Sequence, residues 1–337
     1  MGLKAVPGRS RPRVGLVLGA GGVLGAAWMT GARPALQRRL PCPLGDVDLI
    51  VGTSAGSVLA AALRCGVSVD EMIAHQRGEP VGPLGESAVD DLTGGPWPPA
   101  PQLRLGSARL MLAMLLTPHR VHPTVAASAW LPLGRANHGP LREMVHALHC
   151  HAHGLPVSAE PPDWVTGETW IVAVDYGSGR RAVFGRPGAP PARLPDAVVA
   201  SCSIPGWYEP AAIGGRRYVD GGVRSPTSLG MLARAGVDEV FVLAPMASIV
   251  ADRPRMPHER LERQWRALLT MTMLREVRAL RAAGIGVTVL TPGPEDLAVM
   301  GVNLMDPRRR RLVFETSLAT SAAELATSTG GVAEAVA

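Results

Sequence analysis

Residues 48–64 read DLIVGTSAGSVLAAALR: a short apolar run, a G-x-S-x-G sequence and a row of small residues. The apolar run, closed by Gly52, predicts a buried strand, and the small residues predict a helix to about Arg64. So tight a turn between a strand and a helix requires small residues around the serine. Gly52-Thr53-Ser54-Ala55-Gly56 therefore predicts an elbow that holds the Ser54 hydroxyl at the carboxyl end of the sheet. The helix N-terminus directed at it can stabilise an oxyanion.

The same order of strand, glycine-rich turn and helix occurs earlier in the chain. Residues 14–18 are apolar and β-prone, a glycine turn follows, and a helical pattern continues to about Arg39. Two successive units of this kind are typical of a parallel sheet. We expect a single α/β domain over residues 12–337 after an N-terminal tail 1–11, with a mostly parallel central sheet flanked by helices on both faces. Further strands are expected at Thr169–Val174, Arg181–Phe184, Arg217–Val219, Glu239–Ala244 and Gly286–Leu290, and helices at Pro195–Ser201, Pro226–Ala235, Met256–Ala283 and about Pro307–Thr327.

The turn after the first strand, Gly19-Ala20-Gly21-Gly22-Val23-Leu24-Gly25, suits two kinds of site. Glycines leave backbone N–H groups open to a ligand, so the turn could form an oxyanion hole. The alternative is a dinucleotide-binding loop, whose third glycine would fall at Leu24 and whose acidic residue should follow the second strand. Gly25 stands one place late, and Asp46 and Asp48 precede that strand. The sequence favours the oxyanion hole.

A serine hydroxyl needs a base to become an effective nucleophile. His258 is the one histidine in the second half of the chain, and it lies in a proline- and arginine-rich approach to a long predicted helix. Asp220, in Asp220-Gly221-Gly222 directly after a predicted strand, is the better candidate. As a base it would form a Ser–Asp dyad, with a pKa raised by partial burial. D-G-G taken alone is also an ordinary turn sequence.

Together, the glycine turn with Gly19 and Gly25, the Gly52–Gly56 elbow and the Asp220-Gly221-Gly222 triplet resemble the patatin-like acyl hydrolase family in content and order. Residues 200–205 (ASCSIP) and 208–210 (YEP) are similar to the stretch that the family carries shortly before its aspartate. The resemblance covers roughly residues 12–245. It implies a patatin-like α/β/α fold and a serine acyl hydrolase of lipid carboxylic esters: phospholipid, lysophospholipid or acylglycerol.

Carried over to this chain, the resemblance implies Ser54 as nucleophile, Asp220 as general base, and the Gly21 and Gly22 amides as oxyanion donors. It implies no metal and no cofactor. The chain departs from the family at Leu24, where many members carry Arg or Lys, and at Ala20, where they carry glycine. Two alternatives stay open: a catalytically inactive lipid- or partner-binding protein on the same fold, and an α/β-hydrolase-type esterase that uses His258.

Composition narrows the class of protein and its partners. The chain has 337 residues, is 47% hydrophobic and 18% charged, and so can bury a large core rather than remain disordered. Its net charge of +6 comes from arginine with a single lysine, Lys4, a bias typical of GC-rich coding sequences. Basic residues do not alternate with aromatic ones, so we expect no nucleic-acid partner. The oligomeric state is not predicted.

Cysteine and glycine usage bear on the location of the protein. The four cysteines are widely spaced and form no C-x-x-C pair, which predicts reduced thiols rather than disulfides. They are Cys42, Cys65, Cys150 and Cys202. The apolar stretch 14–32 holds six glycines, which argues against a signal peptide or a membrane span. We expect a cytoplasmic protein, with peripheral contact to a membrane surface left open.

Three segments have more than one interpretation. Residues 80–101 are rich in proline and glycine and predict a surface insertion, followed by an unplaced, lid-like region to about residue 165. Within it, Leu103–Leu116 is either a core helix or a flap over an acyl-chain pocket. His146–His153 has i,i+4 pairs that could chelate zinc, but no second ligand set accompanies them. Arg308–Arg311 is either a solvated face or a contact for anionic head groups.

Overall fold

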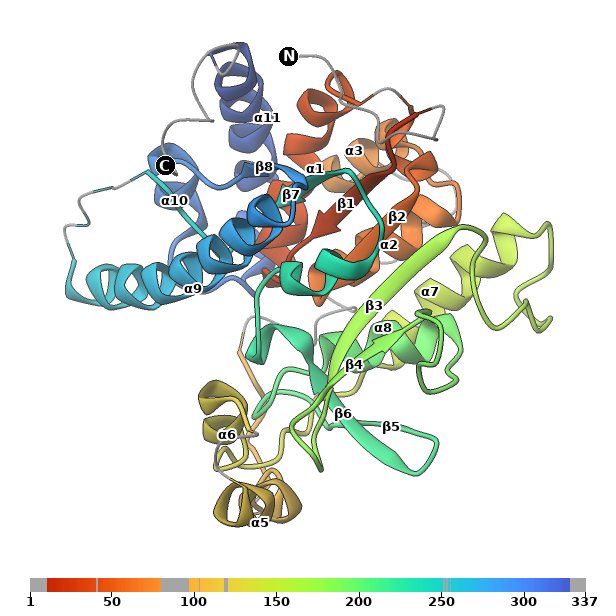
Figure 1. Ribbon diagram of the computed structural model, residues 1–337, viewed down its shortest axis with the longest axis vertical. Coiled ribbons are helices and arrows are strands. Elements are labelled where there is room, and N and C mark those ends of the chain that lie inside the picture. The colour runs from red at the N-terminus through yellow and green to blue at the C-terminus, as the bar shows by residue number, and fades with distance from the viewer. Residues whose placement is uncertain are drawn as a thin grey trace.

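An eight-stranded mixed sheet forms the centre of the computed structural model (Figure 1). The structure describes residues 11–40, 42–79, 97–102, 104–117, 121–250, 252, 254 and 256–327. Within them the strands follow the order β5-β6-β3-β2-β1-β7-β8, and β4 pairs with β3. The strands are β1 (Val14–Leu18), β2 (Leu49–Thr53), β3 (Glu168–Asp175), β4 (Arg181–Phe184), β5 (Ala211–Ile213), β6 (Arg216–Asp220), β7 (Glu239–Leu243) and β8 (Gly286–Leu290).

Five of these strands make a parallel core. Neighbours in the series β3, β2, β1, β7 and β8 all run parallel. β4 and β6 run antiparallel to β3, and β5 runs antiparallel to β6. β1 and β2 are buried at every position, as expected for parallel strands that helices cover on both faces. The predicted mostly parallel α/β sheet is confirmed.

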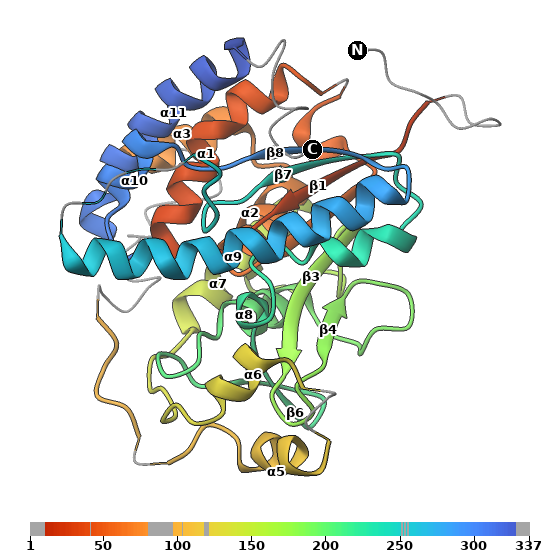
Figure 2. The same cartoon turned by 60° about the vertical axis from the view of Figure 1, so that its left-hand side comes forward.

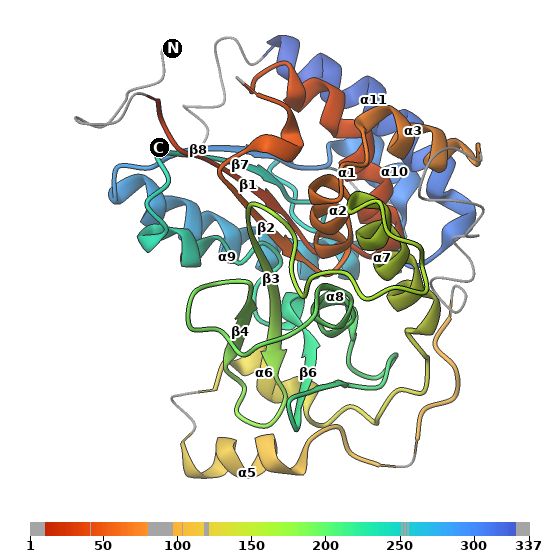
Figure 3. The same ribbon diagram turned by 90° about the vertical axis from the view of Figure 1, so that its right-hand side faces the viewer.

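Helices lie on both faces of the sheet (Figures 2 and 3). Helices α1, α2 and α8 pack against one face, and α9 with the 3₁₀ segment η5 covers the other. The described helices are α1 (Gly22–Gln37), α2 (Ala55–Arg64), α3 (Val69–Arg77), α5 (Ala108–Leu116), α6 (Pro123–Ser128), α7 (Gly139–Ala152), α8 (Leu194–Cys202), α9 (Pro257–Ala282), α10 (Pro294–Met300) and α11 (Arg310–Thr327), and the 3₁₀ segments are η1 (Leu44–Asp46), η4 (Gly221–Val223), η5 (Leu229–Arg234) and η6 (Pro307–Arg309).

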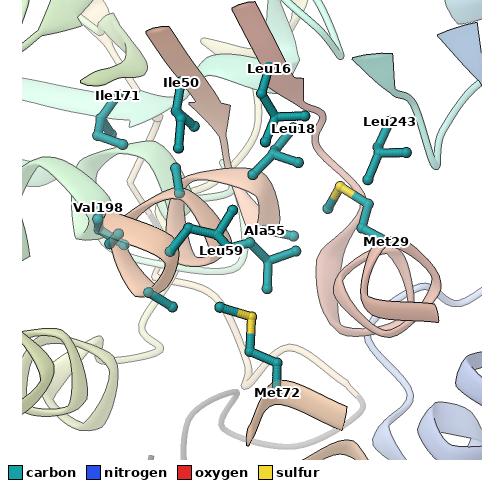
Figure 4. Close-up of a cluster of buried hydrophobic side chains, with 14 of the residues drawn as sticks. Leu16, Leu18, Met29, Ile50, Ala55, Leu59, Met72, Ile171, Val198 and Leu243 are labelled. Atoms are coloured by element: carbon teal, nitrogen blue, oxygen red, sulfur yellow. The ribbon is translucent and has the colours of Figure 1, made fainter. Parts of the chain in front are cut away.

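The core divides along the sheet because side chains of a strand alternate between its two faces. Leu16 and Leu18 of β1 pack in one cluster with Leu59 of α2, as Figure 4 shows. Val17, between them, packs in the second cluster with Met273 of α9. Each fully buried aliphatic side chain of this kind stabilises the fold by about 1.5–3 kcal/mol through removal from water. The sheet edge that carries the strand ends is thereby held rigid between two packed layers.

Several elements differ from their sequence predictions. The helix expected at 226–235 is instead the 3₁₀ segment η5, since Ser228 before it takes a left-handed φ of 56° that an α-helix does not allow. The patterns of α3, α6, α10 and β5 gave no prediction, and of α7 only the C-terminal part around His146–His153 was expected to be helical. The predicted tail lies mostly outside the described residues, as does the insertion up to residue 96.

Helix α5 falls within Leu103–Leu116, the apolar stretch that was interpreted as either a core helix or a flap over an acyl-chain pocket. Its Leu110 is buried in a small cluster with Val125 and Tyr176. In contrast, Leu115 and Leu116 on the same helix are 78% and 72% exposed. The interpretation of this stretch as a core helix is therefore wrong, because most of its apolar surface faces outward.

Candidate active site

Ser54 forms the elbow between β2 and α2. Its φ of 54° and ψ of −124° are unfavourable for a residue with a side chain, and such a conformation costs on the order of 1–3 kcal/mol. Hydrogen bonds hold it in place. The Ser54 N–H donates to Ser201 Oγ at 2.9 Å, and the Ser57 N–H and Oγ donate to the Ser54 carbonyl at 2.7 and 2.6 Å. The strained turn presents the Ser54 side chain at the N-terminus of α2.

The glycines that flank this serine are required by close packing. A Cβ atom on Gly52 would lie 2.6 Å from the Gly56 carbonyl oxygen and from Ser57 Cα. A Cβ atom on Gly56 would overlap the carbonyl oxygen of Leu18, the last residue of β1. The G-x-S-x-G pattern therefore lets α2 approach the ends of both β1 and β2.

We expect Gly56→Ala to lower the free energy of unfolding by about 3 kcal/mol or more, since neither the β1 carbonyl nor the α2 backbone can yield to the added methyl group. Gly230→Ala is the matched control, because its Cβ would meet the Glu276 side chain at an ordinary 3.6 Å. Urea denaturation of both variants measures the difference. Equal stability of the two variants would contradict this account of the elbow.

β3 brings Ser54 and Asp220 together through strand register. β2 pairs with β3 up to Thr53 opposite Val172, and β6 pairs with β3 from Asp220 opposite Ala173. β4 pairs with Ile171–Val174 of β3, a range that overlaps both the part paired with β2 and the part paired with β6. β4 therefore occupies one edge of β3, and β2 and β6 share the opposite edge. These two strands run toward each other, and their last residues meet at adjacent positions of β3. Residues 166 positions apart in the chain thus become neighbours.

The Asp220 carboxylate is buried at this junction, with 5% of the residue exposed. It accepts hydrogen bonds from the Ser54 side chain and from the Gly222 N–H, the latter at 2.7 Å. The Asp220 N–H donates to the Ser203 carbonyl at 2.9 Å. Burial raises the pKa of Asp220 to about 6, although both hydrogen bonds to the carboxylate act to lower it. A carboxylate with this pKa is a stronger base than an exposed one and remains mostly ionised at neutral pH.

The glycine turn after β1 lies against the same junction. The N–H groups of Gly19 and Ala20 donate to the carbonyls of Leu243 and Pro226. The amides of Gly21 and Gly22 have no acceptor among the residues that the structure describes. Gly22, with a φ of 59°, lines the same pocket as Ser54. The turn therefore places open N–H donors at the N-terminus of α1, where the helix dipole also favours negative charge.

The remaining glycines of the three motifs allow close contacts. Cβ atoms on Gly21 and Gly25 would meet the Pro245 ring at 2.7 and 3.1 Å. One on Gly221 would lie 2.5 Å from the Val172 carbonyl oxygen, and one on Gly222 would lie 3.0 Å from the Ala20 Cβ. These contacts pack the glycine turn and the D-G-G triplet together around the end of β2.

A pocket with a cavity volume of about 150 Å³ opens at Ser54. Its walls come from helices α1, α2, α3 and α7 and are mostly apolar. The apolar wall residues are Val23, Ala26, Val58, Leu59, Ala62, Met72, Leu141, Met144 and Leu148. Those of α2 and α7 recur at helical spacing, so each helix lines the pocket with one face over about two turns. This shape and chemistry suit a hydrocarbon chain.

A second pocket lies beside Gly222. Ile204 borders both pockets, so they adjoin at the site. The outer wall of the second pocket includes Leu131, Trp265 and Leu268, each about half exposed. An exposed apolar rim of this kind is typical of an interaction surface.

Comparison with known proteins agrees with this arrangement. The family model described as patatin-like phospholipase matches residues 16–233, a range that holds all three motifs. The chain belongs to the patatin-like phospholipase family. Members of this family are lipid acyl hydrolases.

Two solved structures share some similarity with this patatin-like chain. VipD from Legionella pneumophila is 14% identical, with a TM-score of 0.43, over 94% of this chain and 67% of that one. The type III effector protein ExoU is 14% identical, with a TM-score of 0.42, over 94% of this chain and 53% of that one. The patatin-like chain thus spans about half the length of ExoU. Similarities this low carry no information about activity or substrate.

Leu24 marks the departure from the patatin-like glycine turn. Its side chain is fully buried in the core, and its N–H donates to the Leu304 carbonyl at 2.9 Å. It therefore supplies packing at the position where many patatin-like proteins carry a cation.

Two aromatic residues at the patatin-like site were missed by sequence reasoning. His138 and Tyr208 both line the pocket with Ser54, and their rings stack 3.8 Å apart. Burial and the nearby Arg142 charge lower the pKa of His138 to about 4, so its ring is neutral at pH 7. Tyr208 lies in a stretch that the family resemblance covers, whereas His138 directly before α7 has no signal that distinguishes it from an ordinary helix start.

The alternative base His258 and the possible zinc ligands of His146–His153 lie elsewhere in the patatin-like fold. His258 is exposed on the first turn of α9 and lines neither described pocket. In the His146–His153 segment, His146 contacts Cys150 at 3.5 Å and His153 contacts the His149 carbonyl at 3.0 Å. Among the described residues, no group of three or more His, Cys, Asp or Glu is placed to hold a metal ion.

The arginine run divides between surface and pocket. Arg308 is exposed and forms an ion pair with Asp306 at 2.8 Å. Arg310 instead lines the pocket at Ser54. The interpretation of the whole run as a solvated face is therefore wrong for Arg310. None of the described helices is long and apolar enough to cross a bilayer.

Proposed function

We propose that this chain is a serine acyl hydrolase that cleaves lipid carboxylic esters through a Ser54–Asp220 dyad and an acyl-enzyme. The observation that carries the proposal is the hydrogen bond from the Ser54 hydroxyl to the buried Asp220 carboxylate, at the opening of an apolar pocket. The substrates are phospholipids, lysophospholipids or acylglycerols, with the acyl chain in the pocket.

In the first step, Asp220 takes the hydroxyl proton as Ser54 Oγ attacks the ester carbonyl carbon. The carbonyl oxygen becomes an oxyanion, which accepts hydrogen bonds from the Gly21 and Gly22 N–H groups. The ester C–O bond then breaks. The alcohol leaves with the proton that Asp220 had taken, and the acyl group stays on Ser54.

In the second step, Asp220 takes a proton from a water molecule, which attacks the acyl carbon. The same two amides hold the second oxyanion. The bond from Ser54 Oγ to the acyl carbon breaks, Oγ regains the proton from Asp220, and the fatty acid leaves. The cycle uses no histidine, metal or cofactor, because one carboxylate serves both half-reactions.

The proposal places the protein in the cytoplasm, in peripheral contact with a lipid surface. All four cysteines are free thiols, as is usual in a reducing compartment. The exposed rim of Leu131, Trp265 and Leu268 borders the second pocket beside Gly222. This rim would touch the lipid surface, and the second pocket would receive the alcohol part of the ester.

A covalent probe tests the proposal directly. A long-chain fluorophosphonate reacts with serines that a neighbouring base activates, and we expect one adduct per chain, located on Ser54 by peptide mass spectrometry. Pure protein should also hydrolyse medium- or long-chain p-nitrophenyl esters. Neither an adduct nor any turnover would instead favour a catalytically inactive lipid-binding protein.

The pKa of Asp220 predicts the pH dependence of hydrolysis. The base must be ionised to take the Ser54 proton, and its pKa is raised from 3.8 to about 6. We therefore expect kcat/KM to rise through about pH 6 and to level off above it when measured from about pH 4.5 to 8.5. A profile that is already flat at pH 5 would contradict a buried Asp220 base.

A further inference from the structure

Arg33 is a fully buried cation beside the proposed acyl pocket. Its Nη2 donates to Thr30 Oγ1 at 2.8 Å, and its Nη1 donates to Met72 Sδ. Thr30 and Met72 both line the pocket, so the guanidinium lies directly behind the pocket wall. Its Nε has no acceptor in the described part of the chain, and no ion pair to a described carboxylate is found for Arg33. Burial lowers the pKa of Arg33 to about 9, which still leaves it charged at pH 7.

Two other arginines of this chain, the half-buried Arg64 and the buried Arg266, have the strong acceptors that Arg33 lacks. Arg64 donates to the carbonyls of residues 45, 47 and 168 and to the Thr169 hydroxyl. Arg266 pairs with the Glu262 carboxylate at 2.8 Å and donates to the Pro245 carbonyl at 2.6 Å. The Met72 thioether and the Thr30 hydroxyl, to which Arg33 donates, are weaker acceptors than these carbonyl and carboxylate oxygens. A buried charge is costly unless a strong acceptor meets it, so Arg33 has capacity for a ligand.

The lining of this pocket also includes polar side chains. His75, Gln76 and Arg310 line it together with Thr30. Gln76 is 7% exposed, and its Oε1 has no partner among the described residues. The Arg310 charge and burial lower the pKa of His75, which therefore favours its neutral form. None of the described residues that line the pocket is acidic. The pocket lining thus adds one cation, Arg310, and one buried amide, Gln76, to walls that are otherwise mostly apolar, and a second cation, Arg33, lies behind these walls.

We infer that this pocket selects a medium-length acyl chain that ends in a carboxylate, so that the preferred substrate is a half-ester of a dicarboxylic acid. The inference rests on the proposed function and names its substrate class. The reacting carbonyl would lie at Ser54, and the terminal carboxylate would accept charge-assisted hydrogen bonds from Arg33. The flexible Met72 side chain would turn aside to admit it, as methionine readily does.

Helix geometry sets the length of this acyl chain. On α2 the pocket wall runs from Ala55, next to Ser54, to Ala62, a span of about 10 Å at 1.5 Å per residue. An extended hydrocarbon chain with C–C bonds of about 1.5 Å covers that span with about eight carbons. Figure 4 shows Met72 pointing from α3 toward Leu59 on this face of α2.

Matched esters test this selectivity. We expect wild type to hydrolyse the mono-p-nitrophenyl ester of suberic acid at least about tenfold more efficiently than p-nitrophenyl octanoate, as one charge-assisted contact permits. Arg33→Met should lower kcat/KM for the suberate ester by about tenfold or more while changing that for octanoate by less than about threefold. Arg77→Met is the control, because Arg77 is a partly exposed neighbour paired with Glu315 and does not line the pocket.

The inference is overturned if wild type prefers octanoate, or if Arg33→Met lowers both rates equally. Binding provides a second measurement. Free suberate should raise the melting temperature of wild type more than octanoate does, and should not raise that of Arg33→Met. Without ligand, Arg33→Met should melt no lower than wild type, since it loses an unpaired buried charge. A lower melting temperature together with unchanged selectivity would assign Arg33 a purely structural role and overturn the inference.

The two proposals fail in different ways. If no ester is hydrolysed but suberate stabilises wild type through Arg33, the hydrolase proposal fails and the carboxylate site stands. If both esters are hydrolysed by a Ser54-dependent route without preference, the carboxylate site fails and the hydrolase proposal stands.

Discussion

Replacing Ser54 with alanine should lower kcat for ester hydrolysis by roughly 10⁴-fold or more, down to the residual rate that an oxyanion hole and binding alone provide. The expectation follows from the absence of any other hydroxyl in hydrogen-bond contact with the Asp220 carboxylate among the described residues. Hydrolysis of p-nitrophenyl esters measures the loss. The fluorophosphonate adduct should disappear in parallel.

Ser317→Ala is the matched control for this variant. Ser317 is a fully buried serine of α11 that donates to the Trp28 carbonyl at 2.8 Å, and it lines neither described pocket. The control should keep its activity while losing one buried hydrogen bond. Full activity in Ser54→Ala would eliminate the acyl-enzyme mechanism, whereas equal losses in both variants would indicate a folding defect.

Asp220→Asn should remove activity by a comparable factor and at the same time stabilise the protein at neutral pH. The pKa of Asp220 is raised from 3.8 to about 6 in the folded chain, so the folded state binds its proton more tightly than the unfolded state does. Stability therefore falls as pH rises from about 4 to 6, by at most about 3 kcal/mol, and the loss persists above pH 6. Asparagine keeps an acceptor for the Gly222 N–H without that cost.

Denaturation at several pH values separates this effect from ordinary damage. The stability advantage of Asp220→Asn should be present at pH 7.5, decline between about pH 6 and 4, and vanish below pH 4. His258→Ala is the control for activity and should retain it. A loss of activity in His258→Ala as large as that in Asp220→Asn would instead favour a histidine base.

The sequence predicted the parts of the site that depend on neighbouring residues. The elbow is local: an apolar run, a serine between glycines and a row of small residues suffice to predict β2, the turn and α2. The glycine turn after β1 and the long α9 were predicted for the same reason. The helix prediction at Pro226–Ala235 was wrong because the left-handed conformation of Ser228 depends on tertiary packing, which the local composition does not reveal.

The parts that depend on distant residues were not predictable from pattern. The short β5 forms by pairing with β6 and has no apolar alternation of its own. The pocket is lined mainly by faces of four helices, of which α3 was not predicted and α7 was expected only at its C-terminal end. Arg33 lies in an unremarkable helical stretch, and only packing shows that it lacks a strong acceptor. Asp220 was selected as a candidate base from its D-G-G sequence after a predicted strand, and the family resemblance then joined this weak turn signal to a distant serine.

The shared edge of β3 has a consequence for biosynthesis. Ser54 leaves the ribosome long before Asp220, and the two meet only after β3 has formed and β6 has paired beside β2. A chain interrupted anywhere before residue 220 holds the serine, the glycine turn and part of the pocket, yet lacks the base of the proposed mechanism. Under the proposed Ser54–Asp220 mechanism, ester cleavage would therefore be a property that the nascent chain acquires late.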